Sequence, residues 1–469
     1  MVNVMKIAVV GTGYVGLVSG TCFAEWGNEV VCVDKNAKKI AGLNQGRLPI
    51  YEPGLDTLVE RNYAAGRLSF TSDLATAVRG AAVVFIAVGT PSRPGHGDAD
   101  LSFVYMAAKE IAAFLDENAV VVIKSTVPVG TGDAVEKIIA TVRPRGSFSV
   151  ASNPEFLREG VAINDFLKPD RVVIGAGDER ARNVLMALYG EPLAAQDTPI
   201  VVTQRRTSEL IKYASNAFLA TKITFINELA DLCEQVGTDV GDLALGVGLD
   251  RRIGSSFLNA GPGYGGSCFP KDTLALLRTA QDCGVALRIV EETVTANEAR
   301  KRKMALKVVD AVGGDVDGLT IAVLGLTFKP DTDDMRDAPS VPLIETLQRL
   351  GATIRAYDPV GAENAAHILD NVTFLDDPYE CARDADAVVV VTEWECIRRL
   401  DLAALRKVVR TPALVDLRNA FEPGAAAAAG FQVSAIGRPA ARQYEANLAI
   451  RLDSNKARAR ELRRMEGVA

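Results

Sequence analysis

One cysteine stands where covalent chemistry is feasible. Cys268 lies inside the run GYGGSCFPKD, residues 263–272, directly after a cluster of glycines that includes Gly265. Glycine lets the backbone approach a ligand closely, and a cysteine beside accessible backbone amides can react as a thiolate nucleophile. Most cysteines are instead small buried apolar residues. These ten residues alone leave both interpretations open.

A lysine and an amide share one face of a predicted helix. Residues 207–236 contain neither proline nor glycine, their apolar residues recur at helical spacing, and Lys212 and Asn216 lie four positions apart. Such a pair can stabilise an anionic intermediate or orient a water molecule. It is equally compatible with a lysine whose ammonium reaches solvent beside an amide used in helix packing.

Acid–base work falls to carboxylates, lysine or water, because the sequence has only two histidines. One of them, His96, lies in a predicted exposed loop and is given no role. Glu155 and Glu159 occur in the segment NPEFLREG, residues 153–160, and would share a face if that segment were helical. An exposed acidic turn is the alternative.

A glycine-rich turn near the start predicts a dinucleotide site. A short apolar strand at residues 6–10 leads into GTGYVG, which opens a helix, and Asp34 ends the next predicted strand. The glycines permit close approach to a pyrophosphate that the helix N-terminus stabilises, and the carboxylate favours NAD over NADP. Lys35 and Lys39 lie nearby and weaken that preference. The residues predicted to hold NAD here are Gly11, Gly13, Tyr14, Val15, Gly16 and Asp34.

Two further buried strands, predicted at residues 81–88 and 119–123, end in small polar residues. The first leads to Thr90 and the second to Thr126. Ligands of doubly wound sheets bind outside the carboxyl ends of the strands. Both endings are therefore expected to face the cofactor.

A second α/β unit is predicted nearer the C-terminus. Its strands are expected at residues 319–324, 353–357, 387–392 and 413–417. The first strand-to-helix turn lacks the three-glycine pattern, so no second dinucleotide is expected there. Lys329, Arg336 and Arg418 stand at or just beyond strand ends and could bind a nucleotide diphosphate or stay solvated. The same choice applies to Arg252.

These patterns predict an α/β protein with two Rossmann-like, doubly wound parallel-sheet domains joined by a central segment of long helices. With 469 residues the chain is too long for a single core. The predicted divisions are an NAD-binding domain at residues 1–203, a central helical and dimerising domain with the cysteine loop at 204–312, a second Rossmann-like domain at 313–440, and a charged tail at 441–469.

Composition excludes several classes of protein. Lysine and arginine number 52 against 59 aspartate and glutamate, so the net charge of −7 offers no general basic surface for nucleic acid. No apolar run approaches the length of a membrane span, and the first residues lead into a strand without a signal-peptide pattern. The seven cysteines are scattered without a CxxC pair, which argues against a disulfide framework and a zinc site. A cytoplasmic protein without a metal, nucleic-acid or membrane partner is expected.

The order of the motifs is specific. GTGYVG, STVPVG, NPEFLREG, the Lys-x-x-x-Asn helix, GPGYGGSCFPKD and GLTFKPDTDDMR follow one another along the chain. In this combination the chain resembles the UDP-glucose/GDP-mannose dehydrogenase family, whose members oxidise a nucleotide-sugar alcohol to a carboxylate with NAD. The resemblance covers residues 5–440 and is most specific at the cysteine run. It implies UDP-glucose as the substrate and UDP-glucuronate as the product, with GDP-mannose and UDP-N-acetylmannosamine as the alternative substrates of relatives.

The resemblance also implies a mechanism. Cys268 would attack the C6 aldehyde left by a first oxidation, and the thiohemiacetal would be oxidised to a thioester and hydrolysed, with two NAD⁺ consumed. The other catalytic residues implied are Lys212 and Asn216 for oxyanions, and Asp272, Glu155 and Thr126 for acid–base and water-holding steps. A catalytically silent nucleotide-binding relative is the alternative of a different class, and the presence of Cys268, Lys212 and Asp272 argues against it.

Binding residues follow from the same resemblance. The cofactor set adds Lys39, Thr90, Thr126, Glu159 and Arg336 to the glycine-rich turn. The substrate set is Glu155, Phe156, Leu157, Lys212, Asn216, Arg252, Phe257, Leu258, Asn259, Ala260, Gly261, Gly265, Lys329 and Arg418. Arg252 would come from a neighbouring subunit, which implies a homodimer or a larger homo-oligomer.

Overall fold

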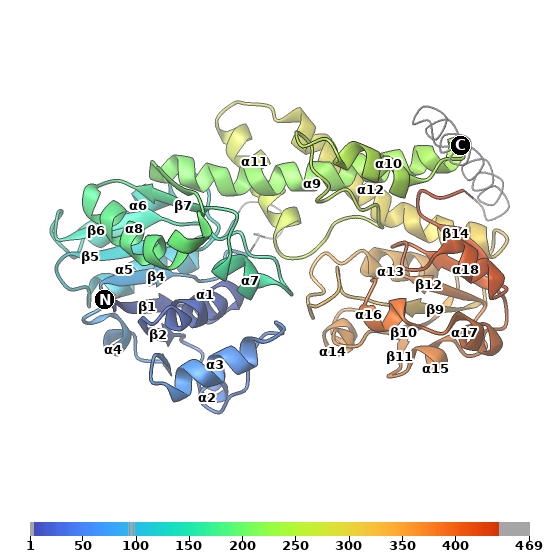
Figure 1. Ribbon diagram of the computed structural model, residues 1–469, viewed down its shortest axis with the longest axis horizontal. Coiled ribbons are helices and arrows are strands. Elements are labelled where there is room, and N and C mark those ends of the chain that lie inside the picture. The colour runs from blue at the N-terminus through green and yellow to red at the C-terminus, as the bar shows by residue number, and fades with distance from the viewer. Residues whose placement is uncertain (1–3, 92, 94–96, 98, 440–469) are drawn as a thin grey trace, which may run out of the picture. The chain divides into compact units, whose positions relative to one another are not determined.

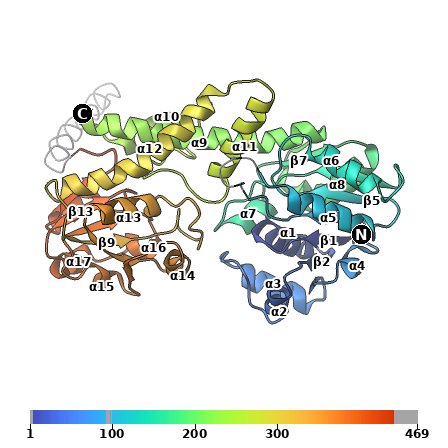
Figure 2. The same ribbon diagram turned by 180° about the vertical axis from the view of Figure 1, so that it is seen from behind.

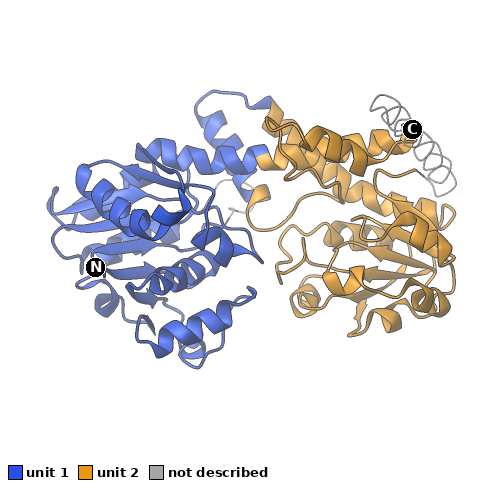
Figure 3. Cartoon of the chain, viewed as in Figure 1, with its two compact units in different colours: residues 1–218, 271–288 blue, residues 219–270, 289–469 orange. Residues whose placement is uncertain are grey.

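The computed structural model describes residues 4–91, 93, 97 and 99–439. The predictions for His96 and for the tail at residues 441–469 lie outside these residues. The chain forms two compact units, coloured separately in Figure 3: unit 1 is residues 1–218 and 271–288, and unit 2 is residues 219–270 and 289–469. One boundary cuts the cysteine run between Pro270 and Lys271. The predicted domain divisions at residues 203 and 312 stay predictions.

Unit 1 is built on an eight-stranded sheet (Figure 1). Its strands are β1 Lys6–Val10, β2 Glu29–Val33, β3 Leu68–Thr71, β4 Val83–Ile86, β5 Ala119–Ile123, β6 Phe148–Ser152, β7 Val172–Ala176 and β8 Ile200–Thr203. The order is β3-β2-β1-β4-β5-β6-β7-β8, with one antiparallel pairing, between β6 and β7. The first six strands have the order of a dinucleotide-binding sheet, whose switch point lies between β1 and β4.

Helices cover both faces of this sheet. They are α1 Tyr14–Glu25, α2 Ala37–Leu43, α3 Leu55–Ala64, α4 Leu74–Val78, α5 Ser102–Ala112, α6 Thr131–Ala140, α7 Ala162–Leu167, α8 Glu179–Leu193 and a 3-10 turn at Ala194–Gln196. Alternate residues of β1 supply two cores: Ile7 and Val9 pack with residues of α1, α3, α7 and α8, and Ala8 with residues of α4, α5 and α6. A sheet buried on both faces explains the continuous Val/Ile runs of its strands.

Unit 2 is built on a six-stranded, fully parallel sheet, seen from both sides in Figures 1 and 2. Its strands are β9 Thr320–Leu324, β10 Thr353–Tyr357, β11 Val372–Phe374, β12 Ala387–Val390, β13 Ala413–Asp416 and β14 Gln432–Ala435. The order β11-β10-β9-β12-β13-β14 repeats that of the first six strands of unit 1. Its helices are α13 Ser340–Arg349, α14 Ala362–Ala366, α15 Pro378–Ala382, α16 Glu395–Arg398, α17 Leu402–Val408 and α18 Pro423–Ala428.

The remaining helices come from the middle of the chain. They are α9 Arg205–Val236, α10 Val240–Gly248, α11 Phe269–Asp282 and α12 Arg288–Ala311. Buried residues of α9 and α12 in unit 2, such as Ile226 and Met304, join one core of the second sheet. No helix among the residues that the structure describes is long and apolar enough to cross a bilayer.

The predicted fold class is confirmed, while three short strands were missed. β3, β11 and β14 are at most four residues long and contain Ser, Thr or Gln, whereas equally short strands such as β4 and β12 are continuous apolar runs that a sequence pattern reveals. The segment at residues 153–160 is not helical, so Glu155 and Glu159 do not share a helix face. The carboxylate of Glu155 instead accepts a hydrogen bond from the Leu157 amide, and Gly160 adopts a positive φ of 84°.

Candidate active site

The glycine-rich turn after β1 is shaped to receive a dinucleotide. Gly11 has φ +105°, and a Cβ there would lie 2.6 Å from the Ala87 carbonyl oxygen. A Cβ on Gly16 would lie 2.0 Å from the Gly11 carbonyl oxygen, whereas a Cβ on Gly13 would meet nothing within 4 Å. The first turn of α1 contains no acidic residue and no side-chain cap, so its N–H groups can serve a pyrophosphate. The residues present therefore fit an NAD molecule.

Asp34 occupies the position expected of the ribose-binding acid. Its carboxylate accepts hydrogen bonds from the Thr12 amide at 3.0 Å and the Thr12 hydroxyl at 2.8 Å, and Lys39 lies 3.3 Å away. Burial acts to raise the pKa of Asp34, but the hydrogen bonds from Asn36 and Thr12 outweigh it and the pKa lies below its usual value. The side chain stays an ionised acceptor at the end of β2.

Glu52, which sequence reasoning missed, fastens two predicted binding segments together. Its buried carboxylate accepts from the Gly160 amide at 2.6 Å, the Ala162 amide at 2.7 Å and the hydroxyl of Tyr14. Tyr14 belongs to the glycine-rich turn, and Gly160 ends the segment that carries Glu155. The only signal in the sequence is a carboxylate between two prolines, in PIYEPG at residues 49–54.

Two threonines meet at the ends of β4 and β5. The hydroxyl of Thr90 donates to the carbonyl oxygen of Thr126 at 3.0 Å. Thr90 is buried, while Thr126 is partly exposed. The predicted placement of both residues at the carboxyl edge of the sheet is therefore observed, next to the switch point.

Glu155 and Lys212 form a buried ion pair. The Lys212 Nζ lies 3.1 Å from Glu155 Oε1, and the two side chains are 4% and 5% exposed. The Phe156 ring lies 5.3 Å from the same ammonium. A buried pair of this kind persists only when both charges are compensated. The structure therefore rules out both the solvated lysine and the exposed acidic turn that the sequence left open.

Asn216 lies one helical turn after Lys212 and contacts a second acid. Its Nδ2 donates to Asp272 Oδ2 at 2.6 Å, and Lys271 Nζ lies 2.5 Å from Asp272 Oδ1. Asp272 is only 1% exposed and belongs to the first turn of α11. Unit 1 therefore brings together Lys212, Asn216, Asp272 and Glu155 as two adjacent polar pairs.

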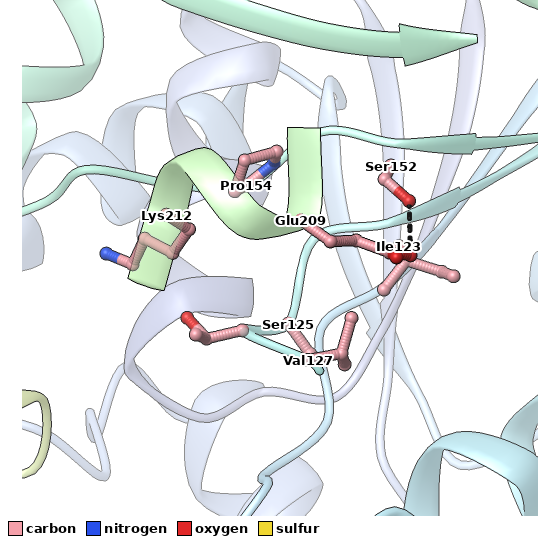
Figure 4. A pocket seen from close by; sticks show the side chains of 8 residues that line it. Ile123, Ser125, Val127, Ser152, Pro154, Glu209 and Lys212 are labelled. Atoms are coloured by element: carbon pink, nitrogen blue, oxygen red, sulfur yellow. Dashed lines mark hydrogen bonds between the residues drawn. The ribbon is translucent and has the colours of Figure 1, made fainter. Parts of the chain in front are cut away.

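A cavity of about 10 Å³ lies beside these pairs (Figure 4). Among the side chains that line it, Thr126 and Lys212 were predicted, and Ser125, Ser152 and Glu209 were not. The Glu209 carboxylate accepts from Ser152 and from the amides of Gly130 and Gly132. Burial raises the pKa of Glu209, and the two amide hydrogen bonds oppose the rise. Figure 4 shows the Lys212 ammonium pointing away from the Ser152–Glu209 hydrogen bond.

Cys268 belongs to unit 2 and immediately precedes α11. It is partly exposed, forms no disulfide, and its Sγ lies 3.4 Å from the Ser267 hydroxyl. Side chains of α12 hold the preceding loop, since Asn297 bonds both the amide and the carbonyl of Tyr264. The cysteine is therefore not a buried apolar residue. The side-chain amide of Asn297 holds the loop that precedes it.

The glycines around Cys268 serve packing within the chain. A Cβ on Gly265 would lie 2.3 Å from the Asp337 carbonyl oxygen, and one on Gly266 would lie 2.7 Å from the Phe328 ring. Gly266 also has φ +83° and donates its amide to the Arg336 carbonyl at 2.8 Å. The loop at residues 328–337 therefore fills the space on the Cβ side of these two glycines, and the contact of Gly265 with the substrate stays a prediction.

Unit 2 contains a cavity of about 480 Å³, within the size range of small-molecule sites. Its lining includes four predicted substrate residues, Leu258, Asn259, Ala260 and Arg418, together with Arg398, Arg438, Glu393 and Asn419, which were not predicted. Asn419 Oδ1 is buried and has no hydrogen-bond partner among the described residues. A pocket with three arginines and an unsatisfied amide oxygen suits an anionic ligand with hydrogen-bond donors.

The other predicted residues of unit 2 are dispersed. Phe257 adopts φ +65° and packs edge-to-face on Phe269, 6.0 Å away. A Cβ on Gly261 would lie 3.2 Å from Arg418, so this glycine packs against the arginine. Lys329 lies 5.6 Å from the Phe328 ring. Two exposed arginines pair with nearby acids: Arg252 with Asp250 at 2.6 Å, and Arg336 with the buried Asp334 at 2.7 Å.

Three family models match successive parts of this chain. They describe the NAD binding domain, the central domain and the UDP binding domain of the UDP-glucose/GDP-mannose dehydrogenase family, over residues 5–193, 206–299 and 322–423. The chain belongs to this family. Its cofactor is NAD, as predicted, and it is an NAD-dependent oxidoreductase with a nucleotide-sugar substrate.

Individual relatives agree with this family assignment. A UDP-glucose 6-dehydrogenase of Rhizobium meliloti (strain 1021) is 60% identical over 93% of this chain and 100% of its own length. One from Bacillus subtilis (strain 168) is 48% identical over 94% and 95%. The structure of a UDP-glucose dehydrogenase from Pyrobaculum islandicum has a TM-score of 0.82 at 40% identity, covering 89% of this chain and 95% of its own.

A relative with another substrate has the same fold. The structure of a UDP-D-ManNAc dehydrogenase from Pyrococcus horikoshii has a TM-score of 0.81 at 27% identity, covering 92% of this chain and 99% of its own. A dehydrogenase named for another sugar therefore shares this architecture. The choice of sugar rests on individual side chains and not on the fold.

Proposed function

We propose that this protein is a UDP-glucose 6-dehydrogenase that oxidises the C6 alcohol of UDP-glucose twice to give UDP-glucuronate. The assignment of UDP-glucose as the substrate rests on the 60% identity with the Rhizobium meliloti UDP-glucose 6-dehydrogenase over 93% of the chain. The unit 2 cavity supports a nucleotide diphosphate because arginines line it beside Leu258 and Ala260. Glu393, paired with Arg418 at 3.3 Å, holds that arginine in place.

In the first oxidation the chain supplies the base and NAD⁺, when bound, accepts the hydride. Glu155 takes the proton of the C6 hydroxyl, directly or through water, and Lys212 stabilises the developing negative charge on oxygen. The buried pair places the Lys212 ammonium 3.1 Å from the Glu155 carboxylate before the substrate arrives. The product of this step is the C6 aldehyde.

Cys268 then allows a second oxidation of the same carbon. Its Sγ forms a bond to the aldehyde carbon and the thiol proton passes to the aldehyde oxygen, which gives a thiohemiacetal. Loss of a hydride to a second NAD⁺ and of the hydroxyl proton leaves a thioester. Asn216 and Lys212 stabilise the oxyanions of these steps through hydrogen-bond donors fixed in advance.

Water completes the reaction. Asp272, held by Asn216 and Lys271, orients a water molecule that attacks the thioester carbonyl, and Thr126 is the second residue assigned to that water. The carbon–sulfur bond breaks, Cys268 leaves as a thiolate and the sugar is released as a carboxylate. Two NAD⁺ are reduced for each sugar oxidised.

The protein is proposed to act as a homodimer in a reducing compartment, the cytoplasm. Large apolar side chains are exposed along α9 and α10: Phe225, Leu232, Val236 and Leu245 are all more than half exposed. Clustered apolar exposure on two neighbouring elements is typical of a subunit interface. All seven cysteines lack a disulfide, as expected under reducing conditions. The homodimer is tested by sedimentation. A dimeric wild type and a monomeric Phe225→Glu variant would support it, and a monomeric wild type would refute it.

The decisive measurement is the yield of NADH per sugar. Purified protein is incubated with excess NAD⁺ and a limiting amount of UDP-glucose, GDP-mannose or UDP-N-acetylmannosamine. Two NADH per UDP-glucose, and much slower reaction with the other two sugars, are expected. Cys268→Ser is expected to lose carboxylate formation while nucleotide binding is retained. One NADH per sugar, or faster oxidation of GDP-mannose, would overturn the proposed function.

A further inference from the structure

Lys124 is a buried lysine that none of the steps above uses. It directly follows β5 and precedes Ser125, so it begins the loop that carries Thr126. Its residue is 4% exposed. A lysine is almost never buried to this extent without a carboxylate partner. It lies at the carboxyl end of β5, at the same edge of the sheet from which the Glu155 segment leaves β6.

The hydrogen-bond partners of Lys124 are uncharged. Its Nζ donates to Asn153 Oδ1 at 2.9 Å and to the Tyr189 hydroxyl at 3.2 Å, and that hydroxyl donates to the same Asn153 oxygen at 2.6 Å. The rings of Phe166 and Tyr189 lie 5.8 and 5.6 Å from the ammonium. Two oxygens and two ring faces thus surround Nζ, and all of them are neutral.

Asn153 connects this lysine to the predicted acid. It is the first residue after β6, two positions before Glu155, and it is tied down by bonds of its Nδ2 to the Val173 carbonyl and of its amide to the Ile123 carbonyl. Lys124 therefore stands where the Thr126 loop and the Glu155 segment both begin. Moving its ammonium would move the start of both.

The charges facing Lys124 come from two further elements. Burial lowers the pKa of Lys124 to about 7, Glu155 on the segment after β6 opposes the fall, and Lys212 on α9 adds to it. Tyr189 on α8 stays neutral because burial raises its pKa. The pKa of Lys124 therefore lies close to neutral pH.

We propose that Lys124 is a positioning residue of this dehydrogenase, holding the Glu155 segment through Asn153 and stabilising the Glu155 carboxylate with its charge. The inference rests on the proposed function for the role of Glu155, but the placement of Lys124 is independent of the substrate. Its charged form favours an ionised Glu155 and its neutral form does not.

The consequence is a specific change in the pH profile of the rate. Lys124→Met and Lys124→Gln both remove the charge, and glutamine retains a donor for Asn153. In both variants the acid limb of kcat is expected to move to higher pH by about one unit, the effect of one screened charge at short range. Above pH 8.5 the rates of variants and wild type are expected to converge, because the wild-type lysine is then neutral.

Tyr189→Phe is the matched control, because it removes a hydroxyl from the same network and leaves the lysine charge. Its acid limb is expected to coincide with that of the wild type. An unmoved acid limb in both lysine variants would overturn the proposal. So would an equal shift in Tyr189→Phe, since the hydrogen-bond network and not the charge would then be responsible.

Stability gives a measurement that does not depend on activity. A lysine whose pKa is lowered on folding binds fewer protons in the folded chain than in the unfolded chain between the two pKa values, so stability rises with pH in that window. The melting temperature of the wild type relative to Lys124→Met is therefore expected to rise from pH 7 to pH 9. A constant difference would show that the lysine does not titrate there and would overturn the proposal.

The NADH stoichiometry and the pH dependence of melting separate a failure of the proposed function from a failure of the role of Lys124. The lysine variants are expected to yield two NADH per UDP-glucose, as the wild type does, so that only the pH dependence changes. If the wild type gave a different stoichiometry while the melting difference still rose with pH, the proposed function would be wrong and the placement of Lys124 would stand.

Discussion

The first six strands of unit 1 and the sheet of unit 2 have the same strand order and a similar first turn, and only the sheet of unit 1 is a dinucleotide site. Gly11 follows β1 and Gly325 follows β9; both have positive φ, +105° and +84°. Each donates its amide to the strand alongside, Gly11 to Val33 and Gly325 to Tyr357, at 2.8 Å. A Cβ would lie 2.6 Å from Ala87 in the first and 2.5 Å from Thr392 in the second. The first glycine is therefore a requirement of the turn and not of the cofactor.

The two turns diverge directly afterwards. In unit 1 the helix α1 begins at Tyr14, three residues after Gly11, so its N-terminus lies at the switch point. In unit 2 the next helix, α13, begins only at Ser340. The intervening stretch packs Phe328 against Gly266 of the cysteine loop. Unit 1 offers helix amides to a phosphate directly after its first strand. In unit 2 the segment at the corresponding place, after β9, holds the loop of Cys268.

The acids that end the second strands differ in the same way. Asp34 is partly exposed, and its nearest partners are Thr12, Asn36 and Lys39. Asp358, at the end of β10, is buried and accepts from the amides of Leu326, Thr327, Val360 and Gly361 and from the Trp394 indole. An acid saturated by its own chain cannot serve a ribose. An acid at the end of a strand can therefore bind a ligand only when the protein's own N–H groups do not already occupy its carboxylate.

The largest effect should come from adding one methyl group to each first glycine. Gly11→Ala and Gly325→Ala both force a Cβ into backbone at a positive φ, so each is expected to cost about 1–3 kcal/mol of stability. Only Gly11→Ala should also raise the dissociation constant of NAD, by tenfold or more, because it displaces the turn that meets the pyrophosphate. Calorimetric titration with NAD and thermal unfolding separate the two. Equal loss of NAD affinity in both variants would show that the comparison is mistaken.

A smaller effect is expected from the two acids. Asp34→Asn should weaken NAD binding by about fivefold to twentyfold and improve relative binding of NADP, since one charged acceptor is worth roughly 1–2 kcal/mol. Asp358→Asn should leave NAD affinity unchanged and lower the stability of unit 2, because a buried amide nitrogen would face several N–H donors. Titration with both dinucleotides and melting curves give the readouts. If Asp358→Asn altered the NADP-to-NAD ratio, the second acid would not be purely structural.

Sequence reasoning was strongest where a pattern is local. Residues 7–10 and 119–123 are continuous apolar runs, and strands occur at residues 6–10 and 119–123. Spacing alone placed Lys212 and Asn216 on one face of α9, and both are buried with partners. Local patterns of this kind are set by the chain's own periodicity and need no knowledge of the partner.

The partners themselves could not be deduced in this way. Asn216 meets Asp272 across 56 positions of sequence, and Glu52 meets Gly160 across 108. Contacts of that range depend on packing that a single sequence does not encode locally. The packing of the glycines beside Cys268 could not be foreseen for the same reason, because the loop that packs on Gly266 begins some sixty residues later, at Phe328.

The smallest effect is expected at Glu52, which in unit 1 joins the glycine-rich turn to the segment that carries Glu155. Glu52→Gln keeps the size of the side chain but replaces one acceptor oxygen by a donor, so the Tyr14 hydroxyl and the amides of Gly160 and Ala162 share a single oxygen. Loss of one such bond costs about 1 kcal/mol, and the KM for NAD should rise about threefold to tenfold while the KM for UDP-glucose changes less than twofold. Tyr14→Phe, which leaves both amides bonded, should give a smaller rise. Equal changes in both KM values would mean that Glu52 stabilises the unit as a whole and does not specifically hold the dinucleotide turn.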